Sequence, residues 1–239
     1  MNMAVRKKRF PARSPLMLFA FLFILFTSFD STAETKMISV KGTIVSIADG
    51  DTVTLKTASD PKLKVRFVGI DTPETAQGYW GQKAKEKLAE MVNIGSFISV
   101  EIYGKDSYGR SLGRVFSGSV DVNFEMIRSG WAFFYRICDS EKCEIETGAN
   151  IYEIAMRDAC NIAQKQGAGN FDPAKPIPEL PFIYRARTGN RELARWVGDV
   201  KTKRMFPPKE YAKVAVCDRV FFSMESDGLS KGYTKLRSR

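Results

Sequence analysis

The most informative feature of this 239-residue sequence is a residue type that it lacks, because it contains no histidine. Without an imidazole there is no histidine base, so Ser-His-Asp and Cys-His mechanisms are excluded, as is zinc held by histidine. Any hydrolytic chemistry must therefore rest on carboxylates, arginines, lysines, tyrosines or a metal held by oxygen atoms.

Cysteine is also scarce, with four residues at Cys138, Cys143, Cys160 and Cys217. Their spacing is not that of paired metal knuckles, which makes a zinc site the weaker interpretation. An even number favours disulfides in an oxidising compartment. Cys138 and Cys143 flank a short polar loop and are natural partners, which would leave Cys160 with Cys217. Four cysteines allow three pairings, so spacing alone leaves the choice open.

The first 33 residues differ from the rest of the chain. Five basic residues precede an uninterrupted apolar run from Leu16 to Phe26, and the small residues Ser31-Thr32-Ala33 follow. This three-part pattern predicts a secretory signal peptide over residues 1–33 and a periplasmic or secreted protein. Eleven apolar residues are few for a spanning helix, which needs about 20. An uncleaved membrane anchor is the alternative, and only in that case do we expect contact with a membrane.

Positive charge is concentrated at the other end. Residues 188–239 hold 12 basic and 6 acidic residues, whereas residues 34–187 are balanced at 20 of each. The sequence shows no fold for this basic extension. It is either ordinary surface or a region that holds nucleic acid through phosphate contacts. The segment before it, 172–187, begins with a proline-rich stretch that predicts a linker.

The middle of the chain predicts an α+β fold. Alternating apolar residues indicate strands at 38–47, 52–57 and 63–67, a helix at 80–94, two further strands at 98–102 and 111–116, and helices at 122–129 and 150–167. Five strands with a helix after the third are the layout of a five-stranded Greek-key β-barrel, the OB-fold. We therefore expect an OB-fold with about three helices over residues 34–171, followed by the linker and the C-terminal extension.

Chemically active side chains are densest where the predicted strands turn. Asp51 follows the Asp49-Gly50 turn, and Asp71 and Glu74 lie where the third strand ends at Pro73. Carboxylates gathered in this way offer the hard oxygen ligands that Ca²⁺ prefers. Aspartates often merely shape turns, and this is the simpler explanation for Asp51 taken alone.

The motifs in this region occur together in a recognisable order. They are Asp49-Gly50-Asp51-Thr52, Arg66 with Asp71-Thr72-Pro73-Glu74-Thr75, Asp106 with Tyr108-Gly109-Arg110, and Gly130-Trp131 with Tyr135-Arg136. In order and spacing, residues 38–185 resemble the staphylococcal nuclease family. Residues 188–239 depart from the family's pattern.

The resemblance implies a Ca²⁺-dependent endonuclease that hydrolyses phosphodiester bonds of DNA and RNA to 3′-phosphate products. By analogy with the family, each matching position would have a role. Asp51, Asp71 and the carbonyl of Thr72 would bind one Ca²⁺, Glu74 would orient or deprotonate the attacking water, Arg66 and Arg110 would grip the phosphate, and Tyr108 and Tyr135 would contact the substrate. No stable protein partner is expected.

Two alternatives from other functional classes stay open. A non-catalytic nucleic-acid-binding OB-fold protein of the cell envelope would share the barrel but would not need the acids and arginines. An envelope interaction protein built on the same barrel is the other. Retention of Asp51, Asp71, Glu74, Arg66 and Arg110 favours the enzyme.

Overall fold

The structure is a computed structural model, and it describes residues 38–138 and 150–235. The predicted signal peptide and Cys143, the expected partner of Cys138, lie outside the described residues. Within the two described stretches, no helix is both long and apolar enough to cross a membrane.

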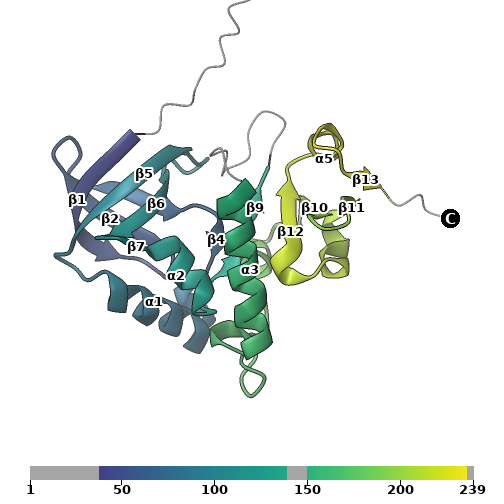
Figure 1. The fold of residues 1–239 in the computed structure, drawn as a ribbon, viewed down its shortest axis with the longest axis horizontal. Helices are drawn as coiled ribbons and strands as arrows, with labels where there is room; N and C mark the ends of the chain where they lie inside the picture. Colours follow the sequence, from purple (N-terminus) through teal and green to yellow (C-terminus); the bar gives the residue numbers. More distant parts are fainter. Residues whose placement is uncertain (1–37, 139–149, 236–239) are drawn as a thin grey trace, which may run out of the picture. The chain divides into compact units, whose positions relative to one another are not determined.

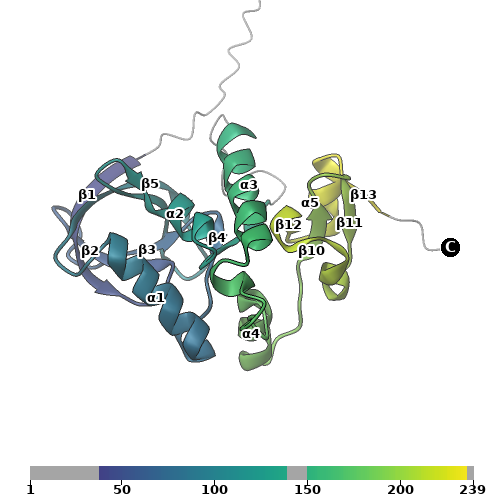
Figure 2. The ribbon, with the colours of Figure 1, turned by 60° about the horizontal axis from the view of Figure 1, so that its bottom comes forward.

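The first part of the chain forms a closed β-barrel (Figures 1 and 2). Its sheet has the order β3-β2-β1-β5-β6-β7, and a parallel pairing between β3 and β6 closes the ring. The strands are β1 (Ile38–Ile47), β2 (Thr52–Thr57), β3 (Leu63–Phe67), β5 (Phe97–Lys105), β6 (Ser111–Ser117) and the short β7 (Val120–Asp121). The predicted five-stranded barrel is confirmed.

The barrel forms because its strands alternate between apolar and polar residues. Val53 and Leu55 on β2 and Val65 and Phe67 on β3 are fully buried, and the residues between them point away from the core. In a strand, successive side chains point to opposite faces, so this pattern gives the sheet one apolar side. Closing the sheet buries that side.

Three helices accompany the barrel and match the predicted ones closely. They are α1 (Tyr79–Met91), α2 (Val122–Arg128) and α3 (Asn150–Gln166). Buried Ala84 and Leu88 of α1 and Met126 of α2 belong to the same core cluster as the barrel strands. A pair of two-residue strands, β4 (Ile70–Asp71) and β8 (Phe133–Phe134), was not predicted, because two residues carry no periodic signal.

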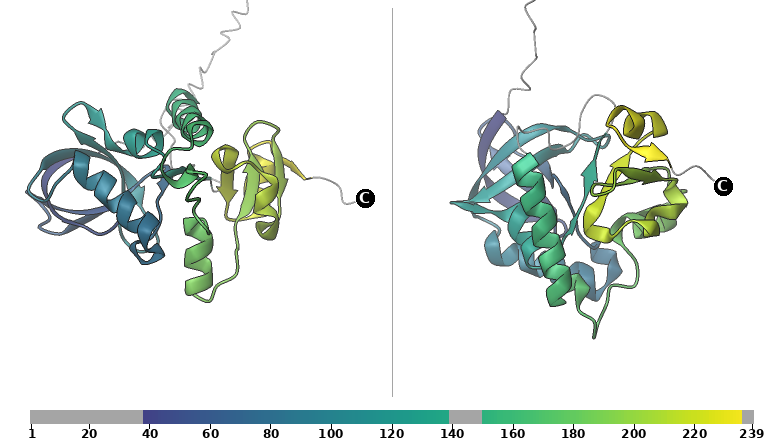
Figure 3. Two further views of the ribbon diagram at one scale, coloured as in Figure 1. Left: turned by 90° about the horizontal axis from the view of Figure 1, so that it is seen from below. Right: turned by 45° about the vertical axis from the view of Figure 1, so that its right-hand side comes forward.

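The C-terminal extension forms a second sheet, a structure that the sequence alone did not indicate (Figure 3). The strand order is β13-β11-β10-β12-β9, so that β9, which directly follows the barrel part of the chain, pairs in parallel with β12. The elements are β9 (Arg136–Ile137), β10 (Trp196–Asp199), β11 (Arg204–Phe206), β12 (Arg219–Phe222), α5 (Glu225–Ser230) and β13 (Thr234–Lys235). Phe222 and Tyr233 are buried in its core.

The predicted linker, residues 172–187, contains a helix at its end. Helix α4 (Pro181–Thr188) has a proline in its first turn, where the missing N–H costs no helical hydrogen bond. Phe182 packs edge-on against Phe221 of the second sheet, and the side chain of Gln77 donates to the carbonyl of Glu179 just before the helix. The segment is therefore ordered by tertiary contacts.

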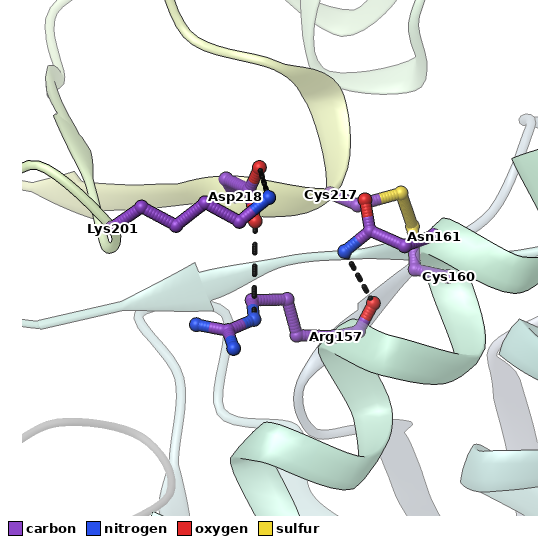
Figure 4. Close-up of a disulfide and its surroundings, with 6 residues drawn as sticks. All are labelled: Arg157, Cys160, Asn161, Lys201, Cys217 and Asp218. Atoms are coloured by element: carbon purple, nitrogen blue, oxygen red, sulfur yellow. Dashed lines mark hydrogen bonds and ion pairs between the residues drawn. A yellow bond between two sulfur atoms is a disulfide. The ribbon is translucent and has the colours of Figure 1, made fainter.

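A disulfide joins Cys160 of α3 to Cys217, which lies in the 3₁₀ turn Val216–Asp218 just before β12 (Figure 4). This is one of the two predicted pairings. Beside it, Asp218 lies between two cations, with its carboxylate 2.7 Å from the ammonium of Lys201 and 3.8 Å from Nε of Arg157. Both features tie the extension to helix α3.

Candidate active site

Asp51 lies at the start of the second barrel strand and is buried, with 4% of its surface exposed. One carboxylate oxygen, Oδ2, accepts hydrogen bonds from both the backbone N–H and the hydroxyl of Thr72, each at 2.8 Å. The other, Oδ1, accepts from the hydroxyl of Thr52. Burial raises the pKa of Asp51, but Arg66 and Thr72 outweigh burial and leave the pKa below its usual range. Asp51 is therefore held as a carboxylate.

Arg66 brings Asp51 and Asp71 together. Its Nε lies 3.2 Å from Oδ1 of Asp51, and its Nη2 lies 3.0 Å from Oδ1 of Asp71. These two nitrogens form one edge of the planar guanidinium, so the oxygens that they contact are neighbours. The two predicted metal ligands, 20 positions apart in the sequence, thus converge at one point.

Asp71 reaches this point because its short strand β4 pairs with β8, opposite Phe133. Three residues later, Glu74 begins a 3₁₀ turn over Thr75–Gln77, and its backbone N–H is held by the side chain of Gln77. The turn directs the Glu74 carboxylate towards the group that also contacts Asp71.

That group is Arg185 of helix α4, which sequence reasoning did not identify. Its Nη1 donates to Asp71 Oδ1 and to Glu74 Oε1, both at 2.8 Å, and its Nη2 donates to Asp71 Oδ2 at 3.0 Å. Burial lowers the pKa of Arg185, but Asp71 and Glu74 outweigh burial and raise the pKa above its ordinary value. The guanidinium is charged at any working pH.

The cluster fits a divalent cation by its donors and its charge. Asp49, Asp51, Asp71 and Glu74 carry four formal negative charges, against two positive charges on Arg66 and Arg185. Burial, followed by the neighbouring Asp51, raises the pKa of Asp49 to about 7, so this carboxyl carries only part of its formal charge near neutral pH. Hard oxygen ligands suit Ca²⁺ or Mg²⁺. Among the described residues no group of three acidic side chains forms a complete metal cage, so such an ion would need further oxygens from a backbone carbonyl, water or phosphate.

Arg110 and Tyr108 form a neighbouring pair on the turn before β6. Arg110 is fixed by Asp106, whose carboxylate accepts from its Nε at 2.7 Å, and its guanidinium carbon lies 5.5 Å from the centre of the Tyr108 ring. In the part of the chain that the structure describes, the ion pair of Arg110 is with Asp106 rather than with the acidic cluster. The parallel pairing of β3 with β6 places Ser111, the residue after Arg110, opposite Val65, the residue before Arg66.

Tyr108 is 70% exposed and accepts a weak hydrogen bond from Arg191, at 3.3 Å. Arg191, followed by Arg110 and Arg185, lowers the pKa of Tyr108. Arg191 and Arg110 thus both lie beside an exposed aromatic ring. This arrangement is suited to an anionic, ring-containing ligand.

Tyr135 has a more enclosed position. Its ring centre lies 4.6 Å from that of Phe221 and 6.3 Å from that of Phe182. With Asp71 it lines a small cavity at the boundary of the second sheet. The position of Tyr135 is explained by its packing against Phe182 and Phe221. Its contact with substrate stays a prediction.

A model of staphylococcal nuclease homologues matches residues 64–167. Two similar proteins are named uncharacterized endonucleases. One, from Haemophilus influenzae, is 33% identical over 134 residues, which cover 56% of this chain and 67% of that protein. The other, from Escherichia coli O157:H7, is 30% identical over 149 residues, which cover 62% of this chain and 86% of that protein. The chain belongs to the staphylococcal nuclease family.

A third family member resembles more of the chain. Endonuclease YhcR of Bacillus subtilis is 34% identical over 209 residues, which cover 82% of this chain but only 16% of that much longer protein. Because 82% of the chain is a longer stretch than residues 1–187, the similar region must include some residues of the C-terminal extension. The family model, in contrast, ends at residue 167, so Arg185 lies outside the residues that it matches.

Proposed function

We propose that this nuclease-family hydrolase is an exported, Ca²⁺-dependent endonuclease that cuts DNA and RNA and leaves 3′-phosphate products. The observation that carries the proposal is the convergence of Asp51 and Asp71 on one edge of the Arg66 guanidinium. Two carboxylates can hold a cation, and the cation and the arginine together would offset the negative charge by which a phosphate diester repels the attacking water or hydroxide.

Each residue would contribute one part of the chemistry. Asp51 and Asp71, with the carbonyl of Thr72, would hold the cation, whose charge would polarise the phosphate and favour ionisation of water. Arg66 would bind the phosphate through its planar fork and oppose the charge that grows on its oxygens. Glu74 would take a proton from the attacking water as the water oxygen bonds to phosphorus. The bond from phosphorus to the 5′ oxygen breaks, and the 5′ oxygen would take a proton from solvent water.

Arg110 and Tyr108 would bind the nucleic acid beside the scissile bond. The side chain of Arg110 is 26% exposed and its guanidinium is held in place by Asp106, so it is oriented before the substrate arrives. Stacking of a base on an exposed ring such as Tyr108 is tolerant of sequence and is worth about 1–3 kcal/mol per base. Both features suit an enzyme that accepts DNA and RNA with little sequence preference.

Export is proposed from the N-terminal pattern together with the Cys160–Cys217 disulfide, because such bonds persist in oxidising compartments. Expression of the full chain, followed by cell fractionation and mass measurement, tests it. We expect a periplasmic or secreted protein that begins after Ala33. A protein that stays in the membrane with residues 1–33 attached would support the uncleaved anchor instead.

The catalytic proposal is tested by incubating the purified mature protein with single-stranded DNA or RNA in Ca²⁺, in Mg²⁺ or in chelator. Cleavage of both polymers with Ca²⁺, none with chelator, and fragments that a phosphatase can trim at their 3′ ends are expected. Binding without cleavage in every metal would instead indicate the non-catalytic nucleic-acid-binding protein.

A further inference from the structure

Arg185 occupies the position that a cation would need. Its forked guanidinium spans Asp71 and Glu74 with three hydrogen bonds of 2.8–3.0 Å. Asp71 is a proposed metal ligand and Glu74 the proposed base, so the contacts of Arg185 bear on both at once. The residue comes from α4, beyond the stretch that the family model matches.

A count of lone pairs shows why the carboxylates cannot keep all their contacts. An ionised carboxylate has about four acceptor positions. On Asp51, Thr72 fills two positions of Oδ2, while Thr52 and Arg66 approach Oδ1. Asp51 therefore has no spare lone pair while Thr52, Thr72 and Arg66 keep these contacts, and it would have to give up one of them to bind a cation.

Asp71 is nearly as fully engaged. Arg66 and Arg185 both contact its Oδ1, and Arg185 also contacts its Oδ2. One acceptor position of Oδ2 is left, but a cation that took it would lie beside two guanidinium groups, whose positive charges would repel it in a site with little water. Binding of a cation to Asp71 therefore favours displacement of a guanidinium.

Arg185 is the guanidinium that is easier to displace. Its side chain is 33% exposed, compared with 11% for Arg66, which bridges both aspartates. Helix α4 is anchored independently of Arg185, through buried Pro181, the ring contacts of Phe182 and the hydrogen bond between Gln77 and Glu179. Release of Arg185 thus needs a rotation of its side chain and leaves the helix in place.

We propose that Arg185 is an internal counterion that competes with the divalent cation for Asp71 and at the same time holds the carboxylate of Glu74. Without the ion it offsets part of the negative charge of the acidic cluster and keeps the cluster assembled. When the ion binds, Arg185 leaves Asp71 and Glu74, which frees Glu74 to act on water. The inference rests on the proposed function for the identity of the ion, and ion binding can be measured without nucleic acid or cleavage.

The test is calorimetric titration of Ca²⁺ into the wild-type protein, Arg185→Gln and the control Arg187→Gln. Arg187 is on the same helix, but it is exposed and pairs with Glu179 at the surface. We expect Arg185→Gln to bind Ca²⁺ more tightly than wild type by about fivefold or more, the lower range of common coupling between ligands, and Arg187→Gln to match wild type.

Thermal unfolding gives a second readout. Without Ca²⁺, Arg185→Gln should melt below wild type, because the acids lose their counterion. Saturating Ca²⁺ should raise its melting temperature by more than it raises that of wild type. Equal shifts in the two proteins would contradict the competition.

Unchanged or weaker Ca²⁺ binding by Arg185→Gln would overturn the proposal, as would absence of binding to both proteins. If Arg185→Gln does not fold, Arg185→Lys replaces it, since lysine keeps the charge but cannot bridge two carboxylates with a fork. Its affinity should exceed that of wild type, and equality would again overturn the proposal. Tighter Ca²⁺ binding with no cleavage of nucleic acid by any variant would reject the proposed function alone.

Discussion

The barrel and the C-terminal extension bury similar kinds of core but differ in how their chain segments meet. Barrel strands β1, β2 and β3 follow one another in the sequence and pair as neighbours. In the extension, β9 pairs with β12 across more than 80 residues, and β10 lies between β11 and β12. Local pairing leaves a periodic pattern in the sequence, whereas distant pairing of strands of two to four residues leaves almost none.

Residues from two regions of the chain meet in the candidate active site. The barrel and its adjoining turns supply Asp51, Arg66, Asp71 and Glu74, whereas Arg185 comes from the helix that leads into the extension and packs against it. The helix before the extension therefore reaches the candidate active site as well as the extension's core.

The largest effect is expected from the disulfide that ties the extension to α3. Cys160 and Cys217 are 57 residues apart, and closing a loop of this size stabilises the fold by about 4 kcal/mol in the chain-entropy model. The double substitution Cys160→Ser, Cys217→Ser should lower the free energy of unfolding in urea by roughly this amount. If the substituted protein and wild type unfold at the same urea concentration, the extension does not depend on this link.

Next comes Arg66 at the centre of the barrel's part of the site. Arg66→Lys should lower the cleavage rate by about 10²–10³, nearly as much as Arg66→Ala, because lysine cannot make the two-pronged contact. Lys64→Ala, an exposed change on the same strand, is the control and should retain full activity. An Arg66→Lys enzyme with most of its rate would remove Arg66 from the phosphate-binding role.

Two buried glycines allow the packing of the regions to be compared directly. A methyl group on Gly113 of the barrel would lie 2.5 Å from Cγ1 of Val100, and one on Gly198 of the extension would lie 2.6 Å from the ring of Tyr233. Each change to alanine should cost about 1–3 kcal/mol of unfolding free energy. A much smaller cost at Gly198 would mean that the extension's core is looser than the barrel's.

The smallest effect concerns the charge of the extension. Arg191, which contacts Tyr108, should bind a phosphate of the substrate. Arg191→Ala should lower the slope of log affinity against log salt by about 0.7–0.9, the value of one phosphate contact. Lys209→Ala removes an exposed charge elsewhere in the extension and should leave the slope unchanged. Equal slopes for the two variants would favour a diffuse basic surface.

Five strands, three helices and the order of the acidic and basic motifs could be predicted from the sequence. They depend on alternation, helical spacing and turn residues, which are local properties of the chain. Asp51, Asp71, Glu74 and Arg66 could be named in advance because they lie in short motifs of known spacing. Arg185 could not, since a single arginine in a short helix after a proline-rich stretch carries no signal of its own.

By itself, therefore, the sequence determined the barrel, the absence of histidine chemistry and the identity of most candidate site residues. Three further features appear only in the folded chain: strands of the extension form a second sheet with β9, Tyr135 packs against that sheet, and Arg185 reaches Asp71 across 114 positions. The spacing of apolar residues shows which face of its own helix or strand a residue lies on. It does not show which distant element will pack against that face, because this depends on how all the faces fit together in the folded protein.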